Sequence, residues 1–457
     1  MNNFRYKKCF ASTVLISLCL LSVSCNAKKS DFPEIPAPTS ESAEVTEETS
    51  TEAEKEKEVL TVALPYTSET VDYLYKLYSA KKAGYWDESL SGATVDKSYL
   101  DSMQTDIAIE NIYVPNEGVS PDTIKSWGDE QPDIFLTNDL VSTIDEGLCT
   151  SLDEYLCDNQ LLNTDNVYLS SLKSLIKGGE LYALPYYSTV PLIYGNKDLA
   201  PGGEVPDFRC SLDKFDRYVK SIDPQEGEIV VFAKGYQLIP YICSAFDDEK
   251  ALSSYMLREE YLSKMDRTSG IFERTVDYIN GLYNNGITAN STPDGTDPVH
   301  SRNCAMWIAQ SSDIELWDSY YPNKLYFMQV PVYKDSDEAV PYLTLFPICV
   351  SEKSADKALA SDFAAFLALD EDAIMLADRF EHKPGFLPLI SSSEAWDQII
   401  SDINFGYIAS VYELHMNEAK YSCEVLDDKL YDKIEMELFN GFNSDEPGEV
   451  TLENIYG

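Results

Sequence analysis

Polar and aromatic side chains follow two apolar segments that have the composition of buried strands. Tyr66 and Thr67 come after the apolar run 59–64, and Asn138 and Asp139 close the segment 132–139. An aromatic ring covers the apolar face of a small polyhydroxylated molecule well, and amide and carboxylate groups hydrogen-bond its hydroxyls. Helix N-caps and turns use the same residue types as Asn138 and Asp139. The four residues therefore predict contacts to a small polar molecule, with local capping as the alternative for Asn138 and Asp139.

Signatures of catalytic and metal sites are missing from the sequence. It contains no H-E-x-x-H, G-x-S-x-G, Walker A or G-x-G-x-x-G motif. With 78 acidic residues, neighbouring carboxylates are inevitable, so a glycosidase-like pair carries little information. The three histidines, His300, His382 and His415, are too scattered to predict a zinc site. We expect no catalytic residues, no cofactor and no metal, and keep a glycan-acting enzyme as a remote alternative.

The charge of the chain restricts its partners. The formal net charge is −43, from 35 basic and 78 acidic residues. Nucleic-acid binding depends on clustered Lys and Arg, so no nucleic-acid partner is expected. A strongly acidic surface also disfavours anionic ligands at long range.

Strand and helix patterns alternate along the folded part. Strands are predicted at 59–64, 107–114 and 132–139, and helices at 68–80 and 152–156. Such alternation is typical of an α/β fold with parallel strands, in which ligands bind beyond the carboxyl ends of the strands. About 400 residues follow position 58, more than one hydrophobic core usually spans, so two lobes are expected.

The N-terminus has the pattern of a secretory signal. Residues 1–24 contain a basic start, an apolar run from about position 9 to 23, and the small residue Ser24 before Cys25. The apolar run is shorter than the roughly 20 residues of a membrane span. The ending resembles a bacterial lipobox, which implies a lipid on Cys25 and a place outside the cell, anchored to the outer face of the cytoplasmic membrane. A plain secretory signal or an uncleaved anchor is the alternative.

The segment after the signal predicts a tether. Residues 25–58 are rich in Pro, Ser, Thr and Glu and contain few apolar side chains. They bury too little apolar surface to offset the entropy lost on ordering, so we expect this acidic stretch to be disordered. Repulsion between like charges would extend it and hold a folded domain away from the membrane.

The cysteines do not indicate a disulfide framework. Seven follow Cys25, an odd number spread over a large domain: Cys149, Cys157, Cys210, Cys243, Cys304, Cys349 and Cys423. Buried free thiols are the preferred interpretation. A local bridge between Cys149 and Cys157 remains the alternative.

Short motifs follow one another in a fixed order over about 260 residues. They are Pro132–Asp133, 182–185, Tyr194 with 196–199, Ala305–Met306 interpreted as a helix start, 330–332, a helix over 357–369, and Gly385 with Pro388. In this order, behind a lipoprotein signal, the chain resembles the family 1, carbohydrate-binding type of extracellular solute-binding lipoproteins of bacterial ABC importers.

The resemblance implies an architecture and partners. It implies a two-lobed periplasmic-binding-protein-like fold of type II, each lobe a mostly parallel sheet flanked by helices, with a hinge between the lobes. Lobe one would comprise 59–186 and 346–385, and lobe two 187–345 and 386–457. The lobes would close over a small polar solute, most simply a mono- or oligosaccharide, and pass it to ABC permease subunits. We expect a monomer that touches the membrane through its lipid. A sensor lipoprotein that presents ligand to a membrane kinase is the alternative.

The resemblance also indicates further binding residues. Tyr186 and Tyr187 would border the hinge, Trp307 and Trp317 follow the Ala-Met pair, and Tyr342 and Phe386 lie near the later crossing. With Tyr66, Thr67, Asn138 and Asp139 they complete the predicted ligand-binding set. For each aromatic residue the alternative is ordinary core packing. Tyr186 and Tyr187 are the preferred candidates.

Overall fold

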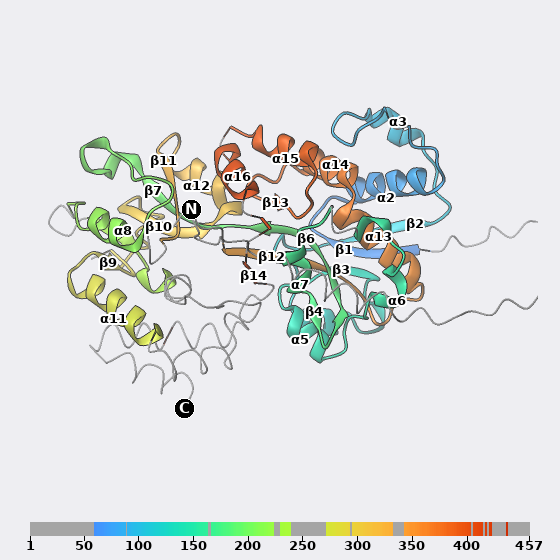
Figure 1. Ribbon diagram of the computed structural model, residues 1–457, viewed down its shortest axis with the longest axis horizontal. Coiled ribbons are helices and arrows are strands. Elements are labelled where there is room, and N and C mark those ends of the chain that lie inside the picture. Colours follow the sequence, from blue (N-terminus) through green and yellow to red (C-terminus); the bar gives the residue numbers. More distant parts are fainter. Residues whose placement is uncertain are drawn as a thin grey trace, which may run out of the picture. The chain divides into compact units, whose positions relative to one another are not determined.

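The computed structural model describes most of the chain after the predicted tether. The described residues are 59–87, 89–162, 166–223, 229–238, 271–292, 295–331, 342–403, 405–414, 416–417, 420–422 and 436 (Figure 1). The predicted signal, Cys25 and the predicted tether lie outside these ranges, as do Cys243, Cys423 and His415. All described residues belong to one compact unit, 56–457.

The larger sheet has seven strands in the described residues. Its order is β13-β6-β12-β3-β1-β2, with β14 pairing β12. The strands are β1 (Val59–Leu64), β2 (Ala108–Tyr113), β3 (Ile134–Leu136), β6 (Ala183–Thr189), β12 (Tyr342–Val350), β13 (Leu387–Pro388) and β14 (Lys420–Ser422). β1 runs parallel to β2 and β3, whereas β12 is antiparallel to β3 and β6. The carboxyl ends of β1, β2 and β3 therefore share one edge, which we call the carboxyl edge.

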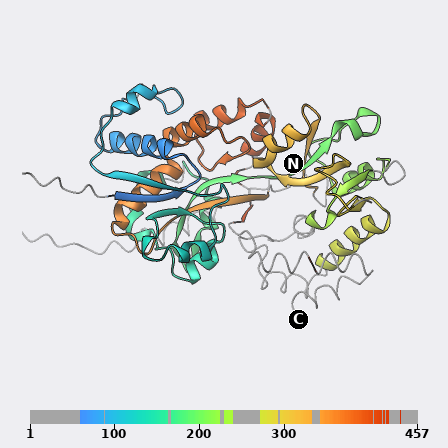
Figure 2. The ribbon, with the colours of Figure 1, turned by 180° about the vertical axis from the view of Figure 1, so that it is seen from behind.

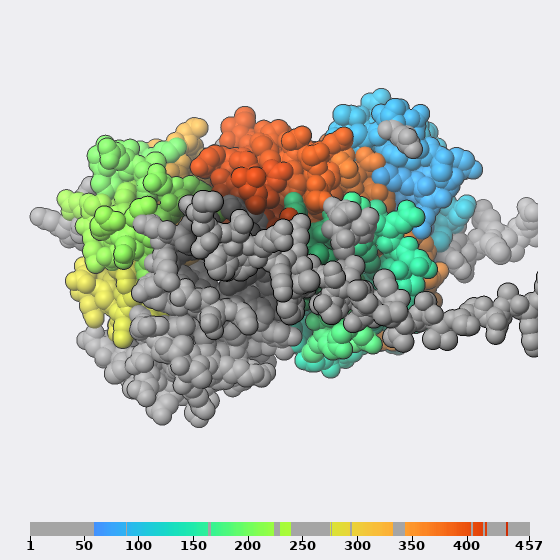
Figure 3. Space-filling model, viewed as in Figure 1, coloured from blue at the N-terminus to red at the C-terminus, as the bar shows by residue number. Residues whose placement is uncertain are grey.

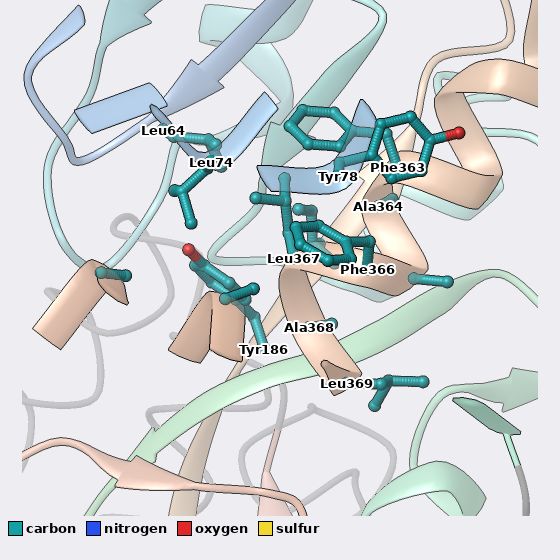
Figure 4. Close-up of a cluster of buried hydrophobic side chains, with 14 of the residues drawn as sticks. Leu64, Leu74, Tyr78, Tyr186, Phe363, Ala364, Phe366, Leu367, Ala368 and Leu369 are labelled. Atoms are coloured by element: carbon teal, nitrogen blue, oxygen red, sulfur yellow. The ribbon is translucent and has the colours of Figure 1, made fainter. Parts of the chain in front are cut away.

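Helices pack on this sheet, and the hydrophobic core lies between the helices and the strands. The main ones are α2 (Ser68–Lys82), α13 (Lys357–Leu369) and α14 (Glu371–Glu381). Residues 363–369 of α13 are all buried, because this helix contacts β6 and β12 as well as α2 and α14. Figure 4 shows Phe363 and Phe366 of α13 near Tyr78 of α2. In the space-filling view the surface of α14 continues into that of α2 (Figure 3).

Shorter elements complete the part of the protein built on the larger sheet, which we call the first region. They are α3 (Lys97–Ser102), α4 (Pro121–Ser126), α5 (Leu140–Asp145), α6 (Asp153–Leu156), α7 (Leu169–Lys173), and the β4 (Ile176–Lys177) and β5 (Glu180–Leu181) hairpin. After β13 come α15 (Ser393–Ile400) and α16 (Gly406–Glu413), which pack on each other.

A second sheet is built from the sequence between β6 and β12. Its order in the described residues is β11-β7-β10-β8-β9, with β7 (Pro191–Asn196), β8 (Val230–Ala233), β9 (Thr288–Ala289), β10 (Cys304–Gln310) and β11 (Leu325–Gln329). We call this sheet and its helices the second region. The helices are α8 (Leu212–Val219), α11 (Ile271–Asn284) and α12 (Ile314–Tyr320). Its own core contains Phe215, Phe232 and Met306.

A short link joins the two sheets. β6 of the larger sheet and β7 of the smaller sheet are separated only by Val190. The chain therefore passes from one sheet to the other as a nearly continuous extended segment, which Figure 2 shows from behind. It returns to the larger sheet at β12.

Most predicted elements are confirmed and one is wrong. The strand 59–64 and the helix 357–369 have the predicted bounds, and the helix 68–80 extends to Lys82. Ala305–Met306 does not begin a helix but lies within strand β10, because Met306 pairs with Gly195 of β7 and Phe232 of β8. Pairing on both sides fixes this apolar run as a central strand.

The lobe boundaries stay a prediction, although strand pairing bears on two segments. The sequence assigned 342–345 and 387–388 to lobe two, whereas Leu343 pairs with β14 and Leu387 with β6, both in the larger sheet. Cys149 and Cys157 are free thiols, the first buried and the second exposed, so the alternative of a local bridge is wrong.

Candidate solute-binding site

The carboxyl edge of the larger sheet brings the first predicted residues together. Asn111 of β2 donates its amide to the Tyr66 carbonyl at 2.7 Å, which ties the end of β1 to β2. The Asn138 N–H donates to the Val119 carbonyl at 3.1 Å, which ties the end of β3 to the loop after β2. Parallel pairing of these strands thus collects Tyr66, Thr67, Asn138 and Asp139 at one edge, as the sequence predicted.

Thr67 and Asp139 have local structural roles there. Thr67 is the N-cap of α2: its Oγ1 accepts from Thr70 N at 3.2 Å and donates to Glu381 Oε1 at 2.9 Å. The Asp139 carboxylate caps α5 by accepting from Ser142 N at 2.9 Å. Capping, the alternative considered from the sequence for Asp139, therefore occurs there, and Thr67 caps α2 in the same way.

Asn138 differs from its neighbour. Its side chain is half-buried, and within the described ranges its amide makes no hydrogen bond. An amide has two donors and an acceptor that a polyhydroxylated ligand can satisfy. Asn138 is therefore the predicted residue best prepared to bind a polar molecule directly.

Four aromatic residues of the predicted set form one cluster beside this edge. Tyr186 donates its hydroxyl to the Tyr66 hydroxyl at 2.6 Å. The Tyr187 ring lies 4.9 Å from Tyr186 and 4.7 Å from Phe386, measured between ring centres. Burial, in each case the largest cause, raises the pKa of Tyr66, Tyr186 and Tyr187 well above the ordinary value, so these hydroxyls stay protonated.

The cavity next to this cluster is too small for a sugar. It measures about 60 Å³ and is lined by the four aromatic residues together with Asp378 and Lys383. This is room for about two water molecules, whereas ligand pockets typically span roughly 300–1,000 Å³. The three tyrosines are packed against one another here and each is at most 7% exposed, so they offer little open surface to a ligand.

Two larger hollows lie elsewhere on the first region. They measure about 620 and 770 Å³, and both include Lys81 and Asp370 in their lining. Lys81 lies in the last turn of α2, a helix that starts at the carboxyl edge and runs away from it. These hollows are therefore far along α2 from the strand ends where α/β sheets bind ligands.

Trp307 and Trp317 pack in the second region. Trp307 is 2% exposed and Trp317 is 8% exposed. The Trp307 ring stacks on Tyr321 at 4.9 Å and lies 5.3 Å from Trp317. Neither indole N–H has a hydrogen-bond partner among the described residues. The structure does not bring these two residues into the Tyr66 cluster. Tyr342 begins β12, and only its backbone is described.

The segments that join the two sheets meet at a buried serine. Ser311 Oγ accepts from Val190 N at 3.0 Å and donates to the Gly385 carbonyl. Ser311 N also donates to the Val190 carbonyl at 2.8 Å. Ser311 thus connects the β6–β7 link, the end of β10 and the segment after α14. This is the arrangement expected at a hinge.

Several groups near the edge were missed by sequence analysis. Tyr113, the last residue of β2, is 70% exposed. Asp313 follows β10 and is half-buried. Its burial, together with repulsion from Glu117, raises the pKa of its carboxyl group. Lys383 contacts both the β1 and β2 ends. Tyr113 was missed because the predicted strand 107–114 runs one residue past it, and no local pattern marks Asp313 or Lys383.

The described part of the chain has neither a membrane-spanning helix nor a metal site. No helix there is long and apolar enough to cross a membrane. No group of His, Cys, Asp or Glu among the described residues is arranged to hold a metal ion.

The two sheets, the links between them and the gathered strand ends define a two-lobed α/β fold of the periplasmic-binding-protein type. A family model described as bacterial extracellular solute-binding protein matches residues 102–406, two thirds of the chain. The protein therefore belongs to this family of bacterial extracellular solute-binding proteins.

Solved structures share the fold at low sequence identity. A cyclo/maltodextrin-binding protein complexed with maltotetraose is 15% identical, with a TM-score of 0.60, and the match covers 88% of this chain and 96% of that one. The sugar-binding protein MalE from Xanthomonas citri is 11% identical, with a TM-score of 0.61 and coverages of 87% and 95%. An ABC substrate-binding protein from Listeria monocytogenes in complex with cycloalternan is 15% identical, with a TM-score of 0.59 and coverages of 88% and 97%. No curated protein sequence matches the chain.

Proposed function

We propose that this protein is a membrane-tethered, extracytoplasmic binding protein that captures a mono- or oligosaccharide between its two lobes and delivers it to an ABC importer. The observation that carries this proposal is the gathering of three strand ends at one edge, with the Asn138 amide unused, beside the Ser311 junction. A polar group left without a partner at a strand end, next to a hinge, is what ligand capture by lobe closure needs. Family membership supports the same role.

The predicted residues divide into contact and supporting roles in this proposal. Asn138 and the exposed ring of Tyr113 contact the sugar, with Asn138 hydrogen-bonding hydroxyls and Tyr113 covering an apolar face. Tyr66, Tyr186, Tyr187 and Phe386 form the packed support behind them, and Thr67 and Asp139 hold the helix starts. Trp307 and Trp317 are buried in the second region and would support it from within, whereas Tyr342 begins β12 of the larger sheet.

Oligosaccharides are the first ligands to test. Two proteins with this fold are named with maltotetraose and cycloalternan as their bound molecules. The affinity of this chain for such compounds is accessible through thermal unfolding, because a ligand that binds only the folded state raises stability by mass action. The gain is about 2.7 kcal/mol at a hundredfold excess over the dissociation constant.

The experiment is a thermal-shift screen of mono- and oligosaccharides on residues 59–457, followed by calorimetry of each hit. We expect at least one sugar to raise the melting temperature and to be recovered chemically unchanged after prolonged incubation. Release of new reducing ends would instead identify a glycan-acting enzyme. If no sugar in the screen shifts the melting temperature, but peptides or other polar solutes do, the carbohydrate assignment is wrong.

Tethering through Cys25 is tested separately on the full chain in bacterial cells. Replacing Cys25 by Ala should release the protein from the membrane fraction into the medium or periplasm and abolish labelling with a radioactive fatty acid. The matched control is Cys157→Ala, which removes an exposed free thiol of the folded part. Equal labelling of the wild type and Cys25→Ala would rule out this lipid site.

A further inference from the structure

Lys383 connects three segments that are far apart in the sequence. It lies between the end of α14 and the start of β13. Its Nζ donates to the Pro65 carbonyl, just after β1, and to Asn116 Oδ1, in the loop after β2. The same Nζ lies 4.7 Å from the centre of the Tyr66 ring. One ammonium group thus holds the ends of β1 and β2 against the segment that joins α14 to β13.

This cation has no ionic partner within the described ranges. No carboxylate there forms an ion pair with Lys383, and the side chain is half-buried. Burial lowers the pKa of Lys383 from the ordinary 10.5 to about 8, with the opposing field of Glu381 smaller than the burial effect. Burying an ammonium group without an ionic partner costs free energy. An ammonium group placed among neutral oxygens and a ring therefore points to a role other than stabilising the fold.

Building on the proposed sugar-binding function, we infer that Lys383 is a positioning residue for ligand capture. Its ammonium group holds residues 65–67 and 116–117 at the spacing at which the carboxyl edge receives the solute. The three N–H donors of the ammonium are divided between two oxygens and the Tyr66 ring face, so the group is occupied by the protein rather than by the ligand.

Loss of the Lys383 proton should weaken this arrangement. A neutral amine keeps two weaker donors, but loses the charge-assisted hydrogen bonds and the attraction to the ring. The titratable groups around it come from α14 and the residue after it, from β6, from the loops after β1 and β2, and from α12. They are Asp378, Glu381, His382, Tyr66, Tyr186, Tyr187, Glu117 and Glu315. The three tyrosines stay neutral, because burial raises their pKa.

The sign of the pH effect separates positioning from stability. Because the pKa of Lys383 is lower in the folded state, the unfolded chain binds more protons between pH 8 and 10.5, and the Lys383 contribution to stability rises with pH in that window. Sugar affinity should move in the opposite direction and fall as pH rises through 8. A residue that only stabilised the fold would not produce opposite trends.

The test compares wild type, Lys383→Met, Lys383→Arg and the control Lys357→Met, with maltotetraose as the probe, by calorimetry at pH 7 and pH 9. Lys357 is another half-buried lysine of the first region, paired with Glu352 at 2.8 Å and located away from the carboxyl edge.

We expect the wild type to lose affinity about five-fold between pH 7 and 9, which is the scale of one partly desolvated cation–π contact. Lys383→Met should bind about five-fold more weakly at pH 7 and show no pH dependence, and Lys357→Met should behave as wild type.

Lys383→Arg provides a further readout, because its guanidinium stays charged at pH 9. This variant should show a flat pH profile. Should Lys383→Met fail to fold, the wild-type and Lys383→Arg profiles still decide the matter. Identical pH slopes for wild type and Lys383→Arg overturn the inference.

A second measurement needs no ligand. Hydrogen exchange at pH 7 should be faster at residues 66–67 and 116–119 in Lys383→Met than in wild type, and unchanged there in Lys357→Met. If maltotetraose does not bind while exchange increases as expected, maltotetraose is not the ligand and the positioning role stands. Unchanged exchange at these amides overturns the positioning role whichever sugar binds.

Discussion

At the scale of single residues, adjacent side chains of similar chemistry have different uses. The Asp139 carboxylate caps α5, whereas the amide of Asn138 has no hydrogen bond within the described residues. Sequence alone marked both, because the residue types that cap helices are also those that bind hydroxyls. Only the position of the α5 N-terminus decides which of the two is occupied.

This difference gives a paired prediction. Asn138→Ala should lower the affinity for the sugar found in the screen about ten-fold, because a ligand hydroxyl loses a partner, and should leave the free energy of unfolding within about 0.5 kcal/mol of wild type. Asp139→Ala should instead cost about 1 kcal/mol of stability through the lost cap. Calorimetry and urea unfolding measure the two quantities. Wild-type affinity in Asn138→Ala would exclude this amide from the site.

A second prediction concerns acid stability in the second region. Burial alone would raise the pKa of Asp297, but hydrogen bonds from the backbone and ring of His300 and the Lys234 ammonium lower it to about 2. Because the folded-state pKa is lower than the ordinary 3.8, the stability from Asp297 is present above pH 4 and is lost as pH falls towards 2. Asp297→Asn should therefore be less stable than wild type at pH 6, and the gap should shrink by pH 2. Urea unfolding at both pH values checks this, with a constant gap as the contrary result.

At the scale of elements, the sequence predicted those whose pattern allows one interpretation. The run 59–64 is short, apolar and followed by Pro65, and it forms β1 with the predicted bounds. The run Cys304–Gln310 is also apolar, but its type depends on pairing with β7 and β8, which come from distant parts of the chain. Periodicity alone does not separate a buried strand from a buried helix segment.

The segment that follows α14 leads to an element-scale prediction. Gly385 has φ +85°, and a Cβ there would lie 2.0 Å from the Ser311 carbonyl oxygen. Gly385→Ala should therefore cost more than 2 kcal/mol of stability and weaken sugar binding, because strain and a clash combine at the junction of the two sheets. The control is Gly178→Ala, with φ +64° and open space around its Cβ, which should cost about 1 kcal/mol. Urea unfolding that shows equal losses in both variants would exclude a special constraint at Ser311.

At the scale of the whole molecule, two-sheet organisation was predictable and the site was predictable only in part. The length and the order of motifs indicated two lobes, and strand ends indicated Tyr66 and Asn138. The contacts of Lys383 arise from three segments more than 45 residues apart, so no local pattern could reveal them. The burial of Trp307 likewise depends on Tyr194 and Tyr321, which belong to other elements.

The net charge of −43 gives a prediction at this scale. A neutral oligosaccharide should bind more tightly than an oligosaccharide of the same size that carries uronic acids, because the acidic protein field repels the anion. Raising the salt from about 0.01 to 0.15 M should narrow the difference, since the screening length falls from roughly 30 to 8 Å. Calorimetry at both salt concentrations measures it. An anionic sugar that binds better at low salt would contradict this expectation.

The order of strands in the larger sheet has a consequence for biogenesis. β12 lies between β3 and β6, yet it is made some 150 residues after β6. While the chain emerges from a ribosome or a translocation channel, β3 and β6 therefore lack the neighbour that separates them, and both expose unpaired edges. Such long-range pairing slows folding, and the larger sheet cannot close until residue 350 has emerged.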